Sequence, residues 1–146
     1  MGVHQHRHAA PASVGVGILS VSTTRAIEND ESGRWIARRA KKEGHDVRFH
    51  QVVTDDINAI RDAALRAIRN HGLQALLVTG GTGITPADVT IEAIKPLFSK
   101  EMTAFGALFA QLSYEEIDSA AILSRAAAGV IGGTVVFCMP GSKKAC

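Results

Sequence analysis

The chain has 146 residues, which is enough for one domain with a sizeable buried core. Hydrophobic residues make up 46% of it and charged residues 21%, as in soluble globular proteins. The formal net charge of +2 is too small to indicate a nucleic-acid-binding protein, and no apolar stretch is long enough to cross a membrane. We therefore expect a cytoplasmic protein that binds neither nucleic acid nor a membrane.

The N-terminal segment, residues 1–13, is polar and carries histidines at alternate positions, His4, His6 and His8. It lacks the apolar stretch of a secretory signal. We predict a disordered tail; metal binding by the histidines is a weaker alternative, because an unanchored tail supplies no fixed ligand geometry. The folded domain is therefore expected to span residues 14–146.

The first half of the domain contains two predicted strand–helix pairs. A continuous apolar run indicates a strand buried on both faces, and a later alternating run indicates a strand nearer the sheet edge. Asp30 or Ser32 fits as the N-cap of the first helix, and glycines follow both helices. The predicted strands are residues 14–21 and 45–53, and the predicted helices are residues 31–43 and 55–71.

The second half is less regular. A third buried strand is predicted before a glycine-rich loop, and the last strand contains Cys138, which we interpret as a small buried hydrophobe. Ser113 and Glu116 fit a capping box, so a new helix is expected to begin there and to end at the glycines near residue 130. The predicted strands are residues 75–78 and 134–139, and the earlier helices are residues 89–97 and 104–112.

Strands and helices alternate along the chain, which indicates an α/β fold: a doubly wound, mostly parallel sheet in a three-layer arrangement. In such sheets, ligands bind beyond the carboxyl ends of the strands. Polar segments follow four of the predicted strands, at residues 22–24, 54–56, 80–85 and 140–144. We expect these segments to face one crevice.

The loop after the third strand is rich in glycine. Its residues are Gly80, Gly81, Thr82 and Gly83. Glycine allows positive φ and lets backbone N–H groups approach an anion, and a helix starting at Pro86 would also attract phosphate. The loop therefore predicts a phosphate cradle, although it matches neither a Walker A loop nor a dinucleotide-binding fingerprint. A tight strand-to-helix turn without a ligand is the alternative.

Two aspartates lie in these polar segments, Asp55 after the second strand and Asp88 after the glycine loop. Each has a structural alternative. Asp88 fits a capping box that begins at Thr85, and Thr54 or Asp55 fits the N-cap of the next helix. Two carboxylates beside a phosphate cradle suit magnesium-dependent phosphoryl or nucleotidyl transfer. Their joint placement favours catalysis, while the capping alternatives stay open.

Several motifs together resemble the MoaB/MogA family of molybdenum cofactor biosynthesis proteins. The resemblance spans about residues 14–146, and the segment LSYEEI brings the chain closer to the MoaB branch. The motifs are LVTGGTGITPADVT at residues 77–90, FGALF at 105–109, LSYEEI at 112–117, LSR at 123–125, MPGSKKA at 139–145, VSTTR at 21–25 and DESGR at 30–34.

The resemblance implies a molybdopterin-binding α/β fold, usually assembled as a homo-trimer or a higher homo-oligomer. It also implies molybdopterin and ATP as substrates, because active members of the family adenylylate the molybdopterin phosphate with Mg²⁺ and release diphosphate. Asp55 and Asp88 would be the catalytic residues and the Mg²⁺ ligands, and the glycine loop would hold the molybdopterin phosphate. Further residues in pocket-lining segments are Ser22, Ser32, Ser124, Ser142 and Lys144.

The sequence also departs from the family pattern. Relatives often carry Arg where this chain has Ala87 and Glu where it has Ala107. They also continue into a helix beyond the position of Cys146, so either this sequence ends early or that helix is absent. These differences support an alternative function, a molybdopterin-binding or scaffold protein without turnover. An unrelated phosphate-binding α/β protein is the third possibility.

Overall fold

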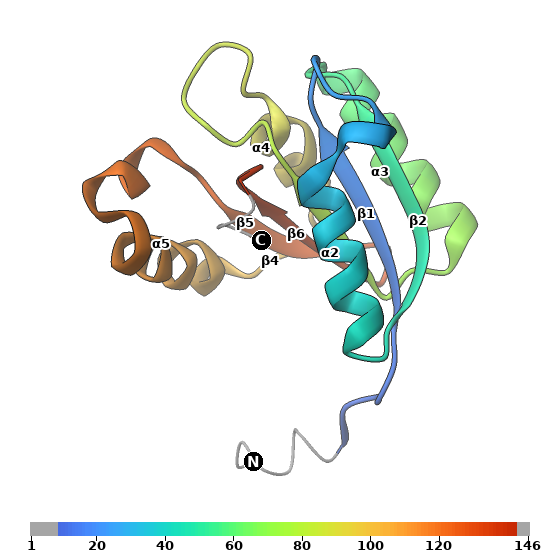
Figure 1. Cartoon of the computed structure of the whole chain (residues 1–146). Helices are drawn as coiled ribbons and strands as arrows, with labels where there is room; N and C mark the ends of the chain where they lie inside the picture. Colours follow the sequence, from blue (N-terminus) through green and yellow to red (C-terminus); the bar gives the residue numbers. More distant parts are fainter. Residues whose placement is uncertain (1–8, 143–146) are drawn as a thin grey trace.

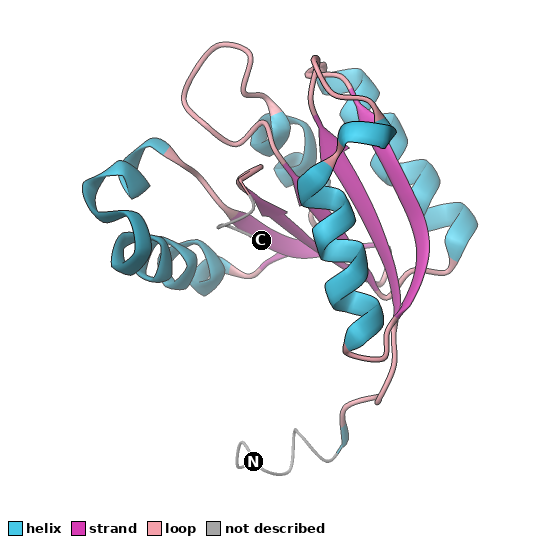
Figure 2. Ribbon diagram, viewed as in Figure 1, coloured by secondary structure: helices cyan, strands magenta, loops and turns pink. Residues whose placement is uncertain are grey.

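The computed structural model describes residues 9–142, which form a six-stranded sheet with helices on both faces (Figures 1 and 2). The strands are β1 (Gly15–Val21), β2 (Asp46–Val53), β3 (Ala75–Thr79), β4 (Lys100–Glu101), β5 (Ala127–Ile131) and β6 (Thr134–Met139). The α-helices are α2 (Glu31–Lys42), α3 (Ile57–His71), α4 (Thr90–Ile94) and α5 (Thr103–Ile117). Short 3-10 helices are η1 (Ile27–Asn29), η2 (Lys95–Leu97) and η3 (Asp118–Leu123).

The strand order is β2-β1-β3-β6-β5-β4. The first four strands run parallel, whereas β5 and β4 are antiparallel to their neighbours. The predicted α/β fold with a mostly parallel sheet is therefore confirmed. The chain leaves central β1 toward β2 on one side and then returns to β3 on the other. The loops after β1 and β3 consequently diverge, which opens a crevice at the carboxyl ends of these strands.

Alternating strand residues build a core on each face of the sheet. Leu19, Leu76 and Val136 pack with α3 and α4 on one face. The opposite face carries α2 and α5, where the rings of Phe105 and Phe137 lie 5.3 Å apart (Figure 1). Cys138 is fully buried, and burial raises the pKa of its thiol to about 12, so it behaves as the predicted hydrophobe.

Two expectations for the second half were wrong. Helix α5 continues without a break through Ser113 and Glu116, so no new helix begins at that pattern. The glycines near residue 130 belong to a hairpin. Gly129 lies in β5, where a Cβ would come within 2.4 Å of the Phe98 ring, and Gly132 and Gly133 form its turn with φ of 54° and 83°. Paired positive φ values are what a two-residue hairpin turn requires.

The carboxylate of Asp30 is fully buried at the N-terminus of α2. It caps α2 as predicted, accepting a hydrogen bond from the Gly33 amide at 3.1 Å. It also accepts one from the Ser20 hydroxyl at 2.5 Å and lies 2.7 Å from Nε2 of His50. Burial alone would raise the pKa of Asp30, but these hydrogen bonds outweigh burial and lower it.

Replacing Asp30 with asparagine is expected to cost about 1–3 kcal/mol of unfolding free energy at pH 7, because buried hydrogen-bond partners lose their ionised acceptor. The stability that ionised Asp30 contributes is present above its unfolded-state pKa of about 3.9 and is lost as the pH falls through its lower folded-state pKa. Urea denaturation at pH 7, 5 and 3 measures both effects. Exposed Asp62→Asn is the control; an Asp30→Asn loss no larger than the control's would contradict this role.

Candidate functional site

A cleft of about 280 Å³ lies where β1, β3 and β6 end. Its lining comes from the loops after these strands and from the segment before β5: Val21, Ser22, Thr24, Arg25, Gly80, Gly81, Thr82, Gly83, Asp88, Ser124, Pro140 and Gly141. A second cavity of about 560 Å³ shares Ser22 and Arg25 with it and extends along the end of β2. The structure therefore brings three of the four predicted polar segments to one cleft, and the fourth, through Thr54, borders the adjoining cavity.

The glycine loop runs closely against its neighbours. Gly80 and Gly81 have φ of 95° and 65°, and the Gly80 amide donates to the Met139 carbonyl at 3.0 Å. A Cβ on Gly80 would lie 2.4 Å from the Val21 carbonyl oxygen. Side chains at these positions would be both strained and obstructed, so the loop needs glycine for its path.

The loop also presents backbone donors. Within residues 9–142, the amides of Gly81 and Thr82 donate no hydrogen bond to another residue. Two hydrogen bonds from Thr90 hold the loop in place. The Thr90 amide donates to the Gly81 carbonyl at 3.0 Å, and the Thr90 hydroxyl donates to the Gly80 carbonyl at 2.8 Å. An anchored loop with unpaired amides at a cleft is suited to binding an anion.

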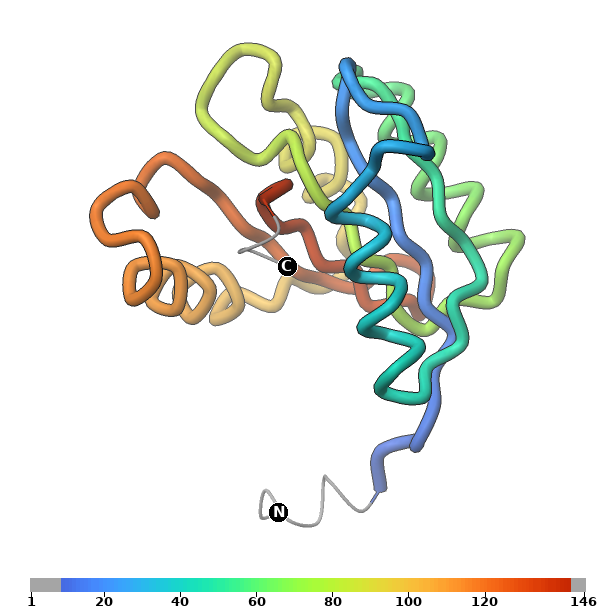
Figure 3. The backbone as a smooth tube through the Cα atoms, in the orientation of Figure 1, coloured from blue at the N-terminus to red at the C-terminus, as the bar shows by residue number. Residues whose placement is uncertain are grey.

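No helix begins at Pro86, so the expectation that a helix N-terminus supports the cradle was wrong. The backbone leaves β3 as an open loop, visible between the strand and α4 in the tube view (Figure 3). Residues 85–88 form a turn closed by the Asp88 amide, which donates to the Thr85 carbonyl at 3.0 Å. Any phosphate binding here must therefore rely on the loop amides rather than on a helix dipole.

Asp88 lies at the rim of the cleft, and its carboxylate is held by Thr85. The Thr85 amide donates to Oδ2 at 3.0 Å and the Thr85 hydroxyl donates to the same oxygen at 2.7 Å. The predicted bond from the Thr85 amide is thus confirmed, although it closes a turn rather than caps a helix. The Thr85 hydroxyl lowers the pKa of Asp88 most; burial opposes it, and the Gly83 amide and the charge of Arg125 add to the lowering.

Asp55 is not the cap of α3. Asp56 is, because its carboxylate accepts a hydrogen bond from the Ala59 amide at 2.8 Å. Oδ2 of Asp55 instead accepts a hydrogen bond from the Thr23 hydroxyl at 2.7 Å, and Oδ1 lies 3.2 Å from the Cβ position of Gly81. The capping alternative for Asp55 is therefore wrong, and the two predicted aspartates lie beside the same loop, Asp55 near Gly81 and Asp88 near Gly83.

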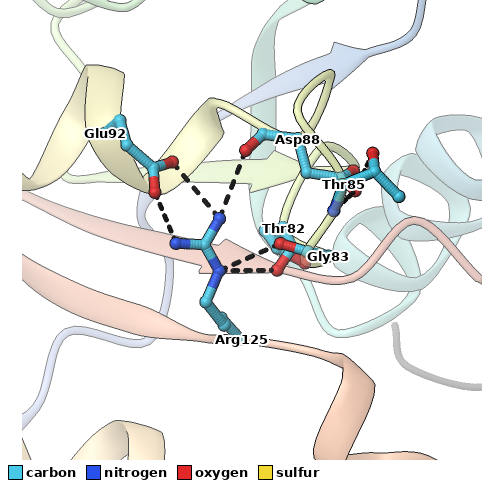
Figure 4. A network of polar contacts seen from close by, with 6 residues as sticks. All are labelled: Thr82, Gly83, Thr85, Asp88, Glu92 and Arg125. Carbon is cyan, nitrogen blue, oxygen red and sulfur yellow. Dashed lines mark hydrogen bonds and ion pairs between the residues drawn. The ribbon is translucent and has the colours of Figure 1, made fainter.

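Two side chains at the site were not predicted from the sequence. Thr23 orients Asp55. Arg125 donates from Nε to the carbonyls of Thr82 and Gly83 at 3.2 and 3.0 Å (Figure 4). The LSR motif contains Arg125, but only Ser124 was assigned to the pocket, because more than 40 residues separate Arg125 from the loop and no local pattern links them.

The comparisons with known proteins agree with this geometry. The family described as a probable molybdopterin binding domain matches residues 17–146. This chain belongs to that family. It is 45% identical to molybdenum cofactor biosynthesis protein B of Bacillus subtilis (strain 168) over 146 residues, 99% of this chain and 86% of the relative. The MoaB/MogA resemblance is thereby confirmed.

This member of the molybdopterin-binding family is also similar to a second protein and to a solved crystal structure. A protein of Pyrococcus furiosus named molybdopterin adenylyltransferase is 42% identical over 151 residues, which covers 99% of this chain and 88% of that protein. A crystal structure of a molybdenum cofactor biosynthesis protein B superposes with a TM-score of 0.88 at 45% identity, covering 93% of this chain and 85% of that one. Sequence and fold therefore indicate the same family.

The remaining predicted residues of this family member differ in their placement. Ser22 and Ser124 line the cleft. Ser32 borders a smaller recess beside it, where its hydroxyl donates to the Gly141 carbonyl at 2.7 Å and so holds the loop after β6. Ser142 is exposed and is not part of the cleft lining. Lys144 and the histidines of the N-terminal tail lie outside the described residues.

The donor set fits magnesium better than a metal held by protein ligands alone. Residues 9–142 contain no cluster of three or more His, Cys, Asp or Glu side chains that could hold an ion. Magnesium does not need one, because it usually binds one or two carboxylates together with water and substrate phosphates. Asp55 and Asp88 fit this pattern.

Within the described part of the chain, no helix is long and apolar enough to span a bilayer.

Proposed function

We propose that this chain acts in molybdenum cofactor biosynthesis by transferring AMP from ATP to the terminal phosphate of molybdopterin. The observation that carries this proposal is the glycine loop, with the unpaired amides of Gly81 and Thr82 and a carboxylate beside each end. The name of the Pyrococcus furiosus relative, molybdopterin adenylyltransferase, supports the same reaction. The chemistry needs an anion cradle and charge neutralisation but little proton transfer, which matches the residues present.

In the proposed reaction the molybdopterin phosphate rests on the amides of Gly81 and Thr82. One of its oxygens attacks the α-phosphorus of ATP, the bond from that phosphorus to the β-phosphate breaks, and diphosphate leaves. Asp55 and Asp88 would hold Mg²⁺, which when bound offsets charge on the phosphates. The adjoining cavity of about 560 Å³ gives room for the second substrate beside the cleft. An ATP-consuming step also fits the cytoplasmic location expected from the sequence.

A molybdopterin-binding or scaffold protein without turnover is the second candidate. It is favoured by Ala87 and Ala107, both exposed, which supply no charge where relatives often carry Arg and Glu. Binding alone would use the same glycine loop, so the cleft is compatible with either function. Turnover of ATP separates the two candidates.

The deciding experiment incubates the protein with molybdopterin, ATP and Mg²⁺ and follows adenylyl-molybdopterin and diphosphate by chromatography. We expect both products, with none when Mg²⁺ is removed by a chelator. Bound molybdopterin without product would establish the scaffold function instead. Absence of both binding and product would exclude the pathway role.

We also propose that the chain assembles through α5 and η3 as a homo-trimer, the number of subunits that the resemblance to the MoaB/MogA family implies. No residue of α5 is fully buried within the monomer, and large apolar side chains stay exposed along this segment. They include Leu108, Leu112, Tyr114, Ile122 and Leu123. So many exposed large apolar side chains in one segment are more typical of a protein interface than of a solvent-facing helix.

Light scattering after size-exclusion chromatography tests this assembly. Wild-type protein is expected at three times the monomer mass, and Leu108→Glu/Leu112→Glu at the monomer mass, because burying two charges in an apolar interface is unfavourable. Asn70→Glu, on the exposed side of α3, is the control and should remain trimeric. A monomeric wild type at micromolar concentration would contradict the proposal.

A further inference from the structure

The side chain of Arg125 contacts three points of one segment, residues 82–92, which lies more than 30 positions earlier in the sequence (Figure 4). Nε donates to the carbonyls of Thr82 and Gly83, and Nη2 donates to the Asp88 carbonyl at 3.2 Å. Glu92 holds the outer edge of the guanidinium, with Oε1 2.5 Å from Nη1 and Oε2 3.2 Å from Nη2. The guanidinium of Arg125 thus donates hydrogen bonds both to the loop backbone and to one carboxylate, that of Glu92.

This arrangement argues against Arg125 as a direct phosphate ligand. Its charge is offset by Glu92, whose hydrogen bond raises the pKa of Arg125 against the opposing effect of burial. The pKa of Glu92 is lowered in turn, chiefly by its hydrogen bond with Arg125. Because the two side chains are 36% and 46% exposed, the ion pair adds little to stability. The main consequence of these contacts is therefore the geometry of the loop.

The contacts decide which way the loop peptides face. In a trans peptide the N–H points away from the carbonyl of the same unit. With the carbonyls of Thr82 and Gly83 turned toward Arg125, the next N–H groups point to the opposite side. One of them, the Gly83 amide, lies on the side of the Asp88 carboxylate, whose Oδ2 is 2.7 Å from the Cβ position of Gly83. Arg125 thus acts on Asp88 twice, at its carbonyl and through the Gly83 amide.

We infer that Arg125 is a positioning residue: it fixes the peptide planes of the glycine loop so that the Asp88 carboxylate is held at the cleft, and Glu92 keeps its guanidinium in register. The catalytic part of this inference rests on the proposed adenylylation. The positioning part does not, because it concerns the loop of the unliganded chain. The backbone amide of Arg125 also donates to the Thr82 carbonyl at 3.0 Å, so the loop keeps one tether when the side chain is changed.

Arg125→Lys tests the inference because lysine keeps the charge and loses the planar fork of donors. Hydrogen exchange followed by NMR should show the Gly83 amide exchanging roughly ten-fold faster or more in Arg125→Lys, because local opening of the loop then costs less free energy. The amides of Leu76 and Val78 in β3 should exchange at unchanged rates. Arg48→Lys is the matched control, since Arg48 also joins a carboxylate, Asp46, to a carbonyl, Gly72, away from the cleft. Unchanged Gly83 exchange in Arg125→Lys would overturn the inference.

Turnover supplies the second readout. We expect Arg125→Lys to lower kcat roughly 10- to 100-fold, the range typical of residues that orient a metal-binding side chain, with KM for ATP nearly unchanged. In an Asp88→Asn background the same change should have little further effect, because both act through one carboxylate. Full activity in Arg125→Lys would show that charge is sufficient and would overturn the positioning role. A wild type without turnover would refute the proposed reaction, while the exchange data would still decide the positioning role.

Discussion

Asp55→Asn and Asp88→Asn are each expected to reduce adenylylation by roughly 100-fold or more, the scale seen when one preorganised charge-stabilising group is removed. Asparagine has nearly the same shape as aspartate but cannot neutralise a cation beside the phosphates. Its amide oxygen can still accept the hydrogen bond from Thr85 or Thr23, so the fold should be retained. The assay is the formation of adenylyl-molybdopterin from molybdopterin, ATP and Mg²⁺, with thermal unfolding measured on the same samples.

Asp56→Asn is the matched control for the first of these changes. Asp56 is the immediate neighbour of Asp55, and asparagine caps a helix about as well as aspartate, so α3 should be unaffected. We expect full activity from this variant. Equal losses in Asp55→Asn and Asp56→Asn would mean that general charge near the cleft, rather than Asp55, matters. If Asp88→Asn lost stability in proportion to activity, its bonds to Thr85 would explain the residue without catalysis.

Gly80→Ala is expected to lower the free energy of unfolding by roughly 3 kcal/mol or more. This loss combines the backbone strain of alanine at a positive φ with a steric clash. The φ of Gly80 is 95°, and the new Cβ would lie 2.4 Å from the Val21 carbonyl oxygen. The Val21 carbonyl belongs to the backbone of β1, so it cannot move aside as the end of a flexible side chain could. Urea denaturation monitored by circular dichroism measures the change, and molybdopterin binding should be lost with it.

Gly44→Ala separates the two contributions to this effect. Gly44 has a similar φ of 87°, but nothing lies within 4 Å of the Cβ position that alanine would add. Its replacement should therefore cost only the conformational strain, about 1 kcal/mol. Similar losses for the two variants would mean that the loop shifts to accommodate alanine, and that the close approach of Gly80 to β1 is not required.

The parts of the fold that were predicted well are those that local physics determines. The apolar run at residues 14–21, the helical spacing in α3 and the run of glycines after β3 each reflect a preference of the segment itself. Errors arose where two local patterns compete. Ser113 and Glu116 satisfy a capping box, yet Ser113 also fits within a helix, and continuation of α5 satisfies more backbone hydrogen bonds than a break would. Gly129 resembled a helix end, but it is a strand position that leaves space for the Phe98 ring.

The assignment of the carboxylates shows the same limit. Asp55 and Asp56 are adjacent, and the sequence patterns suggested Thr54 or Asp55, not Asp56, as the cap of α3. Only the path of the chain from β2 decides between them, since it turns Asp56 toward the Ala59 amide and Asp55 toward Thr23 and the glycine loop. A difference of one position thus separates a helix cap from a candidate metal ligand.

The sequence by itself determined the α/β class and the glycine loop, because strand and helix periodicity and the backbone freedom of glycine are local properties. The roles of Asp55 and Asp88 stay predictions. The tertiary structure alone decided which groups meet. The strand order β2-β1-β3-β6 brings the ends of β1 and β3 together at a point where their loops diverge, and this creates the cleft. It also brings Arg125 to the carbonyls of Thr82 and Gly83. Contacts across such distances depend on the packing of the whole sheet, which no local pattern encodes.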